Sequence, residues 1–180
     1  MKSSRCQLGL AMVLGAALAL PGVVKAAAGD SGSDSSSSFS NQRSAQNAKY
    51  DRAYKAAMNA RYKRAIKMLH EVVAAEPRHA DAHNMLGYSY RKEGQYSKSF
   101  RHYKTALTLD PEHRGAHEYI GQAYLEQKNL EKAKYHLDRL DDICTWGCEE
   151  YDTLKQAVES YKTGGTPAGY SLEEENGGGA

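Results

Sequence analysis

The chain repeats itself with a period of 34 residues, and this repetition restricts its fold more than any other feature. Residues 80–113 and 114–147 are the clearest copies, and a weaker copy, 46–79, precedes them. The matched positions include His83 with His117, Leu86 with Ile120, Gly87 with Gly121, Tyr90 with Tyr124, Ser99 with Ala133 and Tyr103 with Leu137. A fixed period of this length indicates stacked supersecondary units, each contacting only its neighbours.

Each copy is predicted to form two helices. In the middle copy, apolar and small residues recur at the spacing of one helical face, which predicts a first helix over 80–93. Gly94 can end that helix, and a second helix is predicted over 96–109. Because a residue before proline is disfavoured in a helix, Asp110 before Pro111 marks a corner between units.

This pattern resembles the tetratricopeptide repeat (TPR) family, whose units are helix-turn-helix pairs of 34 residues. The middle copy carries the resemblance at Leu86, Gly87, Tyr90, Tyr96, Tyr103, Ala106 and Pro111. The third copy keeps Ile120, Gly121, Tyr124, Ala133 and Leu137. The first copy departs most, with Arg52 and Ala56 opposite Leu86 and Tyr90. The resemblance implies an all-α fold, a right-handed superhelical solenoid of three TPR units over 46–147.

The register continues into a seventh helix, predicted over 148–162. Lys155 falls where the earlier copies have glycine, which is typical of a C-terminal capping helix with a solvated outer face. Glu149 and Glu150 lie in its first turn, where the helix dipole favours negative charge.

The first 28 residues have the three-part pattern of a cleavable signal peptide, with cleavage expected after Ala26 or Ala28. The apolar run, residues 8–20, is too short to cross a hydrocarbon core of about 30 Å, so no stable membrane insertion is expected after cleavage. The prediction is a periplasmic or secreted protein, from which Cys6 has been removed with the signal.

Two segments are predicted to be disordered, a serine-rich linker over 29–45 and a tail over 163–180, because neither offers enough apolar surface to bury. Removal of residues 1–28 leaves 21 basic against 22 acidic side chains. Without a polybasic run, this balance argues against a nucleic-acid partner.

The resemblance implies that the first helix of each unit lines a concave groove that binds a protein or peptide. The residues at these positions are Tyr50, Asp51, Tyr54, Met58, Asn84, Met85, Tyr88, Lys92, Glu118, Tyr119, Gln122 and Glu126. Four of them are tyrosines, a residue enriched at interface hot spots, although some could instead pack between repeats. The Lys/Asn/Arg clamp by which some TPR domains hold a C-terminal carboxylate is missing. Its positions hold Tyr50, Tyr54, Met85, Gly115 and Tyr119.

Charge is distributed unevenly along the chain. Residues 41–70 carry eight basic side chains against Asp51, whereas residues 131–180 carry eleven acidic against five basic. These are either two solvated surfaces or the two ends of a dipolar solenoid that attracts a charged partner. The second interpretation also allows weak head-to-tail self-association, which salt would weaken.

No motif of an enzyme occurs, so no catalytic residue and no cofactor are predicted. His79 and His83, like His113 and His117, have the spacing of metal ligands on a helix, but the repeat itself generates both pairs. We therefore expect packing or surface roles for them, and no metal.

The sequence CTWGC, residues 144–148, leaves two interpretations open. In the repeat register Thr145 takes the place of Pro111, so a Cys144–Cys148 disulfide would replace the proline corner, with Trp146 over the junction or at its edge. Alternatively, the two cysteines could form a thiol-redox or soft-metal site in the periplasm. The absence of C-x-x-C in a thioredoxin-like context favours the staple and a non-catalytic binding scaffold.

Overall fold

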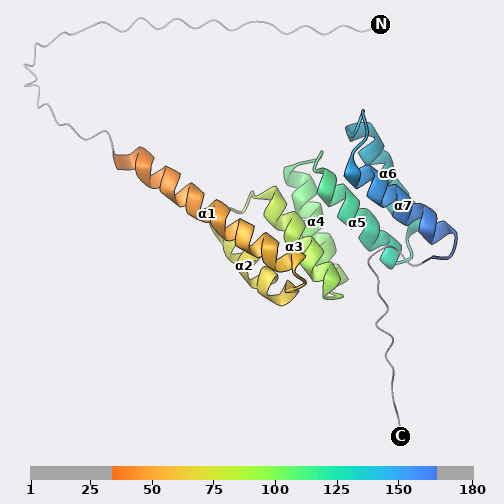
Figure 1. Ribbon diagram of the computed structural model, residues 1–180, viewed down its shortest axis with the longest axis horizontal. Coiled ribbons are helices and arrows are strands. Elements are labelled where there is room, and N and C mark those ends of the chain that lie inside the picture. Colours follow the sequence, from red (N-terminus) through yellow and green to blue (C-terminus); the bar gives the residue numbers. More distant parts are fainter. Residues whose placement is uncertain (1–33, 166–180) are drawn as a thin grey trace, which may run out of the picture.

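The computed structural model describes residues 34–165, and every regular element in this range is an α-helix (Figure 1). The helices are α1 (Asp34–Met58), α2 (Tyr62–Ala75), α3 (Ala80–Lys92), α4 (Tyr96–Leu109), α5 (Arg114–Glu126), α6 (Leu130–Ile143) and α7 (Glu149–Lys162). The predicted signal peptide, its cleavage sites and the tail from residue 166 lie outside the described residues. No helix in the described range is both long and apolar enough to span a membrane.

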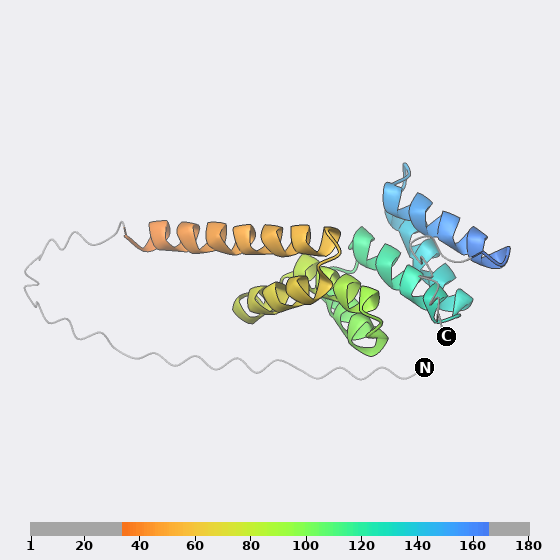
Figure 2. The same ribbon diagram turned by 60° about the horizontal axis from the view of Figure 1, so that its bottom comes forward.

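Consecutive helices form antiparallel pairs, α1 with α2, α3 with α4 and α5 with α6, and α7 packs on both α5 and α6. The pairs stack in chain order, with α1 and α2 at one end and α7 at the other (Figures 1 and 2). The predicted all-α repeat solenoid is confirmed.

The start of α1 differs from the sequence prediction. A disordered linker was expected to reach residue 45, whereas α1 already begins at Asp34. The packed end of α1, around Ala53 and Ala57, supplies the costly helix nucleus, and each further residue then adds a hydrogen bond. Serine, asparagine and glutamine oppose this extension by only a fraction of a kcal/mol each. A lack of apolar residues therefore indicates that the segment buries no face, but it does not prevent helix propagation.

The recurring glycines allow helices to approach closely. A Cβ atom at Gly87 would lie 2.5 Å from the ring of Tyr103, which is fully buried on α4. In the third unit the register suggests the same contact with Leu137 of α6, but Gly121 meets Leu154 of α7 instead, with Cδ2 at 2.5 Å. The seventh helix is therefore anchored to α5 through a position that has no side chain.

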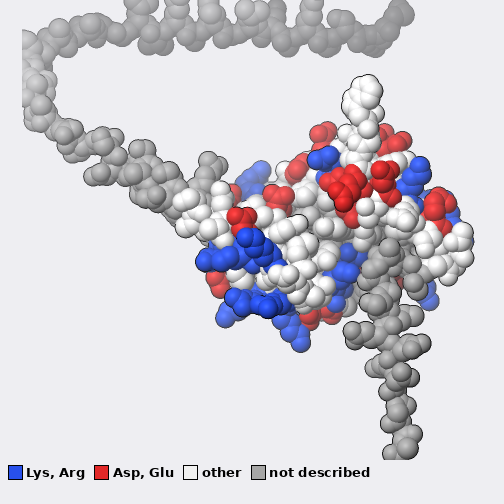
Figure 3. All heavy atoms as spheres, viewed as in Figure 1, with Lys and Arg blue, Asp and Glu red and all other residues white. Residues whose placement is uncertain are grey.

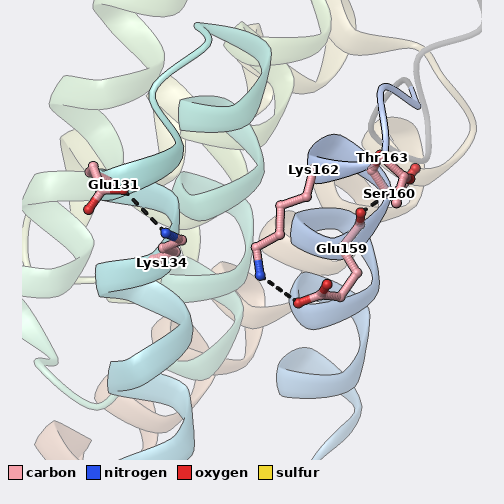
Figure 4. Close-up of polar contacts among 6 residues, drawn as sticks. All are labelled: Glu131, Lys134, Glu159, Ser160, Lys162 and Thr163. Atoms are coloured by element: carbon pink, nitrogen blue, oxygen red, sulfur yellow. Dashed lines mark hydrogen bonds and ion pairs between the residues drawn. The ribbon is translucent and has the colours of Figure 1, made fainter.

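The outer face of α7 is solvated, as predicted for a capping helix, and Lys155 is exposed. Glu159 pairs with Lys162 at 2.7 Å, and the hydroxyl of Thr163 donates to the carbonyl oxygen of Ser160 at 2.9 Å (Figure 4). A similar pair, Glu131 with Lys134 at 3.2 Å, lies on α6. Exposed pairs of this kind contribute little to stability, so their main effect is to keep this end of the array hydrated.

Histidines cap the helices that follow the proline corners. The Nδ1 atom of His79 accepts a hydrogen bond from the N–H of Ala82 at 3.3 Å, and His113 accepts from Ala116 at 3.2 Å. Each cap satisfies one of the backbone donors left unpaired at a helix N-terminus. His79 and His113 thus have a structural role at equivalent turns.

Within the described residues, no group of three His, Cys, Asp or Glu side chains could hold a metal ion.

The corner formed by CTWGC differs from the two proline corners. Cys144 follows the end of α6, Cys148 precedes α7, and their Cα atoms are 5.7 Å apart. Gly147 has a φ of +85°, the left-handed conformation expected for it. Trp146 was expected either over the junction of this corner or at its edge. It is 99% exposed, so it lies at the edge.

Two histidine pairs occupy equivalent places in the second and third units. Nδ1 of His83 lies 3.2 Å from Nδ1 of His102, and Nδ1 of His117 lies 2.9 Å from Nδ1 of His136. In each pair Nε2 of the first histidine donates to a proline carbonyl oxygen, Pro77 at 3.1 Å or Pro111 at 3.0 Å. A neutral imidazole carries one proton, so Nδ1 of the first ring accepts and Nδ1–H of the second donates.

These hydrogen bonds need a neutral first ring in each pair, because its Nδ1 atom must accept. Burial, followed by the neighbouring His83, lowers the pKa of His102 to about 4, and burial, followed by His117, lowers the pKa of His136 to about 3. If both rings of a pair were protonated, two N–H groups would face each other across the contact. Because the unfolded chain takes up these protons near pH ~6.5, acid favours unfolding.

We predict that the free energy of unfolding is greatest above pH ~6.5 and decreases as the pH falls from there towards the folded-state pKa values, by at most about 1.4 kcal/mol per pH unit for each neutral histidine. Urea unfolding at about pH 7 and about pH 5 measures this loss. The double variant His102→Phe/His136→Phe should lose less stability over the same interval. An equal loss in the variant would show that other groups cause the acid sensitivity.

Candidate functional site

The tyrosines predicted to bind a partner lie on the first helices of adjacent units. We define Tyr50 and Tyr54 of α1, Tyr88 of α3 and Tyr119 of α5 as the tyrosine face. The ring centroids of Tyr88 and Tyr119 are 5.0 Å apart, and those of Tyr50 and Tyr54 are 6.3 Å apart. The Tyr88–Tyr119 contact joins α3 to α5, whereas the Tyr50–Tyr54 contact lies within α1.

The other predicted contact residues divide into two groups. Met85, Asn84 and Gln122 are 2%, 5% and 8% exposed, so they offer a ligand almost no surface. Met85 packs in the core between the first two units, which corrects its assignment as a groove residue. The first helices approach each other closely there, and an unbranched apolar side chain fills the space. By contrast, Tyr54 and Met58 are 42% and 41% exposed, and Tyr50, Tyr88, Lys92, Glu118 and Tyr119 are half-buried.

Three tyrosines of this face are hydroxyl donors rather than phenolates. Burial raises the pKa of Tyr119 to about 12, with Glu118 the next cause, and burial also raises the pKa values of Tyr50 and Tyr88. All of these hydroxyls are therefore protonated at neutral pH. They can donate hydrogen bonds to a ligand's carbonyl groups while the rings offer apolar contact area.

Glu118 lies beside this face, and the pKa of its carboxyl group is unusually high. Burial raises its pKa to about 7, and the charges of Glu150 and Glu149 add to the shift. The Nε2 atom of Gln122 donates to Glu118 at 2.8 Å. Near neutral pH this carboxyl group exists in both forms, so it can either donate or accept at the edge of the face.

A buried ion pair, Arg91 with Glu126, supports the tyrosine face. Nη1 of Arg91 on α3 donates to Oε1 of Glu126 on α5 at 2.7 Å, and the two side chains are only 3% and 7% exposed. The guanidinium carbon lies 5.5 Å from the ring centroid of Tyr88 and 5.9 Å from that of Tyr119, within cation–π range. One charged group thus joins two units and orients two of the aromatic rings.

The groove positions predicted from the sequence include Glu126 but not Arg91. A signal was present, because the register puts Arg91 at the position of Ala57 and Leu125 in the other copies, and both of those are buried. A charged residue at a position that is otherwise apolar and buried requires a buried partner. Glu126, the residue directly after the equivalent position Leu125 in the next unit, was the available candidate.

The sequence pattern of the family "Anaphase-promoting complex, cyclosome, subunit 3" matches residues 58–140, slightly less than half of the chain. No curated protein sequence matches the chain.

Two solved structures share the architecture. The first TPR of Spaghetti (RPAP3), bound to the HSP90 peptide SRMEEVD, is 16% identical with a TM-score of 0.57, and the match covers 66% of this chain and 93% of that one. The Sgt2 TPR domain from Aspergillus fumigatus is 17% identical with a TM-score of 0.56, over 74% of this chain and 91% of that one. At these identities the likeness concerns the fold alone: the chain has the helical-repeat architecture of these two TPR structures.

We predict that Glu126→Leu lowers the free energy of unfolding by about 3–5 kcal/mol, because it leaves the buried Arg91 charge without a partner. The double variant Arg91→Met/Glu126→Leu should recover much of this loss, since an apolar pair of similar volume can replace a buried ion pair at little cost. Urea unfolding of the three proteins measures both effects. A double variant as unstable as the single one would argue against this explanation.

Proposed function

We propose that this protein is a non-catalytic scaffold that binds a protein or peptide through the tyrosine face. The observation that carries the proposal is the presence of four tyrosines on three successive first helices, two of which, Tyr88 and Tyr119, lie beside the Arg91 guanidinium of the Arg91–Glu126 ion pair. Tyrosine provides a large contact area with few rotatable bonds, so ordering it on binding costs little entropy. A structural neighbour of the same fold carries a bound peptide, which supports a ligand of this kind.

The chemistry of the face favours an internal or extended peptide segment over a free C-terminal carboxylate. The positions of the carboxylate clamp hold Tyr50, Tyr54, Met85, Gly115 and Tyr119, none of which is cationic. The nearest cations, Arg91 and Lys92, already lie near the ring of Tyr88, at 5.5 and 5.8 Å. We therefore expect aromatic stacking and hydroxyl hydrogen bonds to dominate recognition. The sequence of residues 1–28 leads us to propose that binding takes place in the periplasm or outside the cell.

We predict that Tyr54→Ala/Tyr88→Ala weakens partner binding by at least about 30-fold, the loss expected for a hot spot worth about 2 kcal/mol. Tyr135→Ala is the matched control, because Tyr135 is 59% exposed but lies on α6, a second helix. Envelope proteins captured by immobilised wild type are compared with those captured by each variant. Partners retained by the folded double variant at wild-type levels would contradict the proposal.

We also propose that Cys144 and Cys148 form a structural disulfide rather than a reactive thiol pair. Their Cα separation of 5.7 Å suits a disulfide, and they bracket the corner between α6 and α7. Closing so short a loop is expected to contribute about 2 kcal/mol on the chain-entropy estimate. The bond would therefore fix the direction of the capping helix more than it stabilises the whole array.

We predict that neither cysteine reacts with an alkylating reagent in the native protein, and that both react after reduction. Site-resolved mass spectrometry of the alkylated peptides measures this, and Cys144→Ser/Cys148→Ser should lower the free energy of unfolding by about 2 kcal/mol. A thiol that is free and reactive in the native protein would instead favour the thiol-redox or soft-metal alternative.

A further inference from the structure

Trp146 is exposed to a degree that the fold does not require. It is 99% exposed, more than any other large apolar side chain that the structure describes, and the loop that carries it is fixed. The sulfur atoms of Cys144 and Cys148 are joined across the loop, and the N–H of Gly147 donates to the carbonyl oxygen of Cys144 at 2.9 Å. A rigid, exposed indole is the kind of side chain that anchors an interface, because little entropy is lost when it is buried.

Acidic side chains surround the base of this loop. The uncharged loop between α6 and α7 projects from one end of the molecule, and carboxylates gather below it (Figure 3). Asp141, Glu149 and Asp152 are exposed, and none forms an ion pair with another described residue. A partner for Trp146 should therefore combine an apolar recess with a basic rim.

The opposite end of the same molecule has these properties. A cavity of about 190 Å³ lies between α1 and α2 and is lined by Arg52, Lys55, Ala56, Asn59, Arg61, Arg64 and Met68. Lysine and arginine side chains gather over these two helices (Figure 3). None of the four cations at the cavity is ion-paired with a described residue.

The position of the cavity in the array explains why it is open. Arg52 and Ala56 take the register positions of Leu86 and Tyr90, which are buried against the preceding unit in the middle copy. Among the described residues no helix pair stacks in front of α1 and α2, so no described helix covers the corresponding surface of the first unit. It is therefore the surface on which another repeat array can stack.

We propose that the protein associates head to tail, with Trp146 of one molecule inserting into the α1–α2 cavity of a second copy. Cavities of ~150 Å³ take up a benzene-sized ring, so the recess can accept part of an indole. The arginines at its rim can lie over the ring, and the acidic residues around the loop face the basic rim. The interface joins two different surfaces, so it can propagate into longer oligomers. It does not use the tyrosine face and is independent of the proposed peptide binding.

Sedimentation of the purified protein with its cysteines oxidised, over a range of concentrations, tests the proposal. We expect an average mass that rises with concentration and falls with added salt, and an association constant at least about tenfold lower for Trp146→Ala. Tyr135→Ala removes another exposed aromatic residue and should associate like the wild type. A wild type that remains monomeric at its highest soluble concentration would overturn the proposal, as would association that Trp146→Ala leaves unchanged.

Mixing two variants distinguishes this interface from a symmetric one. Trp146→Ala keeps the cavity but loses the indole, whereas Arg61→Glu/Arg64→Glu keeps the indole but loses the basic rim. Each variant alone should be monomeric, and an equimolar mixture should form a heterodimer and nothing larger, because only one intact interface can form. A mixture that stays monomeric would overturn the head-to-tail arrangement, even if the wild type associates.

Discussion

The ring of Tyr103 fills the space that a side chain at position 87 would need, and the spacing of the helix pairs depends on contacts of this kind. A helix can approach a bulky ring so closely only where it has no Cβ atom. The same condition at Gly121 admits Leu154, which draws α7 rather than α6 onto this position. The close packing of α3 on α4 and the placement of α7 on α5 therefore depend on two residues without side chains.

Close stacking of the first helices buries one charged side chain, and a second side chain of opposite charge compensates it. With the units this close, the residue at position 91 cannot reach solvent, and Arg91 would be strongly unfavourable there without Glu126. An apolar pair would have served stability equally well. What the guanidinium adds is a flat cation beside Tyr88 and Tyr119, which restricts both rings in a way that an aliphatic side chain would not. The ion pair is thus better explained by the order of the tyrosine face than by the stability of the fold.

Most of the fold was predictable because it depends on local pattern and period. The helix Tyr96–Leu109 begins and ends where Gly94 and Asp110 indicate, and the register located α7. The features that could not be predicted depend on distances between units. Whether Met85 is exposed, or whether His83 meets His102, depends on how far one helix is shifted against the next, and the period alone does not give that shift. The four tyrosines could be placed on one face, but their contact with Arg91 could not.

The exposed aromatic residues lie on separate surfaces. Those of the tyrosine face lie on the first helices of the three units, whereas Trp146 lies in the corner after α6, at the end of the stack. Ligand binding on one surface leaves the other accessible, so a peptide and a second array need not compete. If arrays join through their ends, the tyrosine faces of successive molecules repeat along the assembly. A partner with several copies of one segment would then bind with an avidity set by the spacing of these faces, without any new contact in each site.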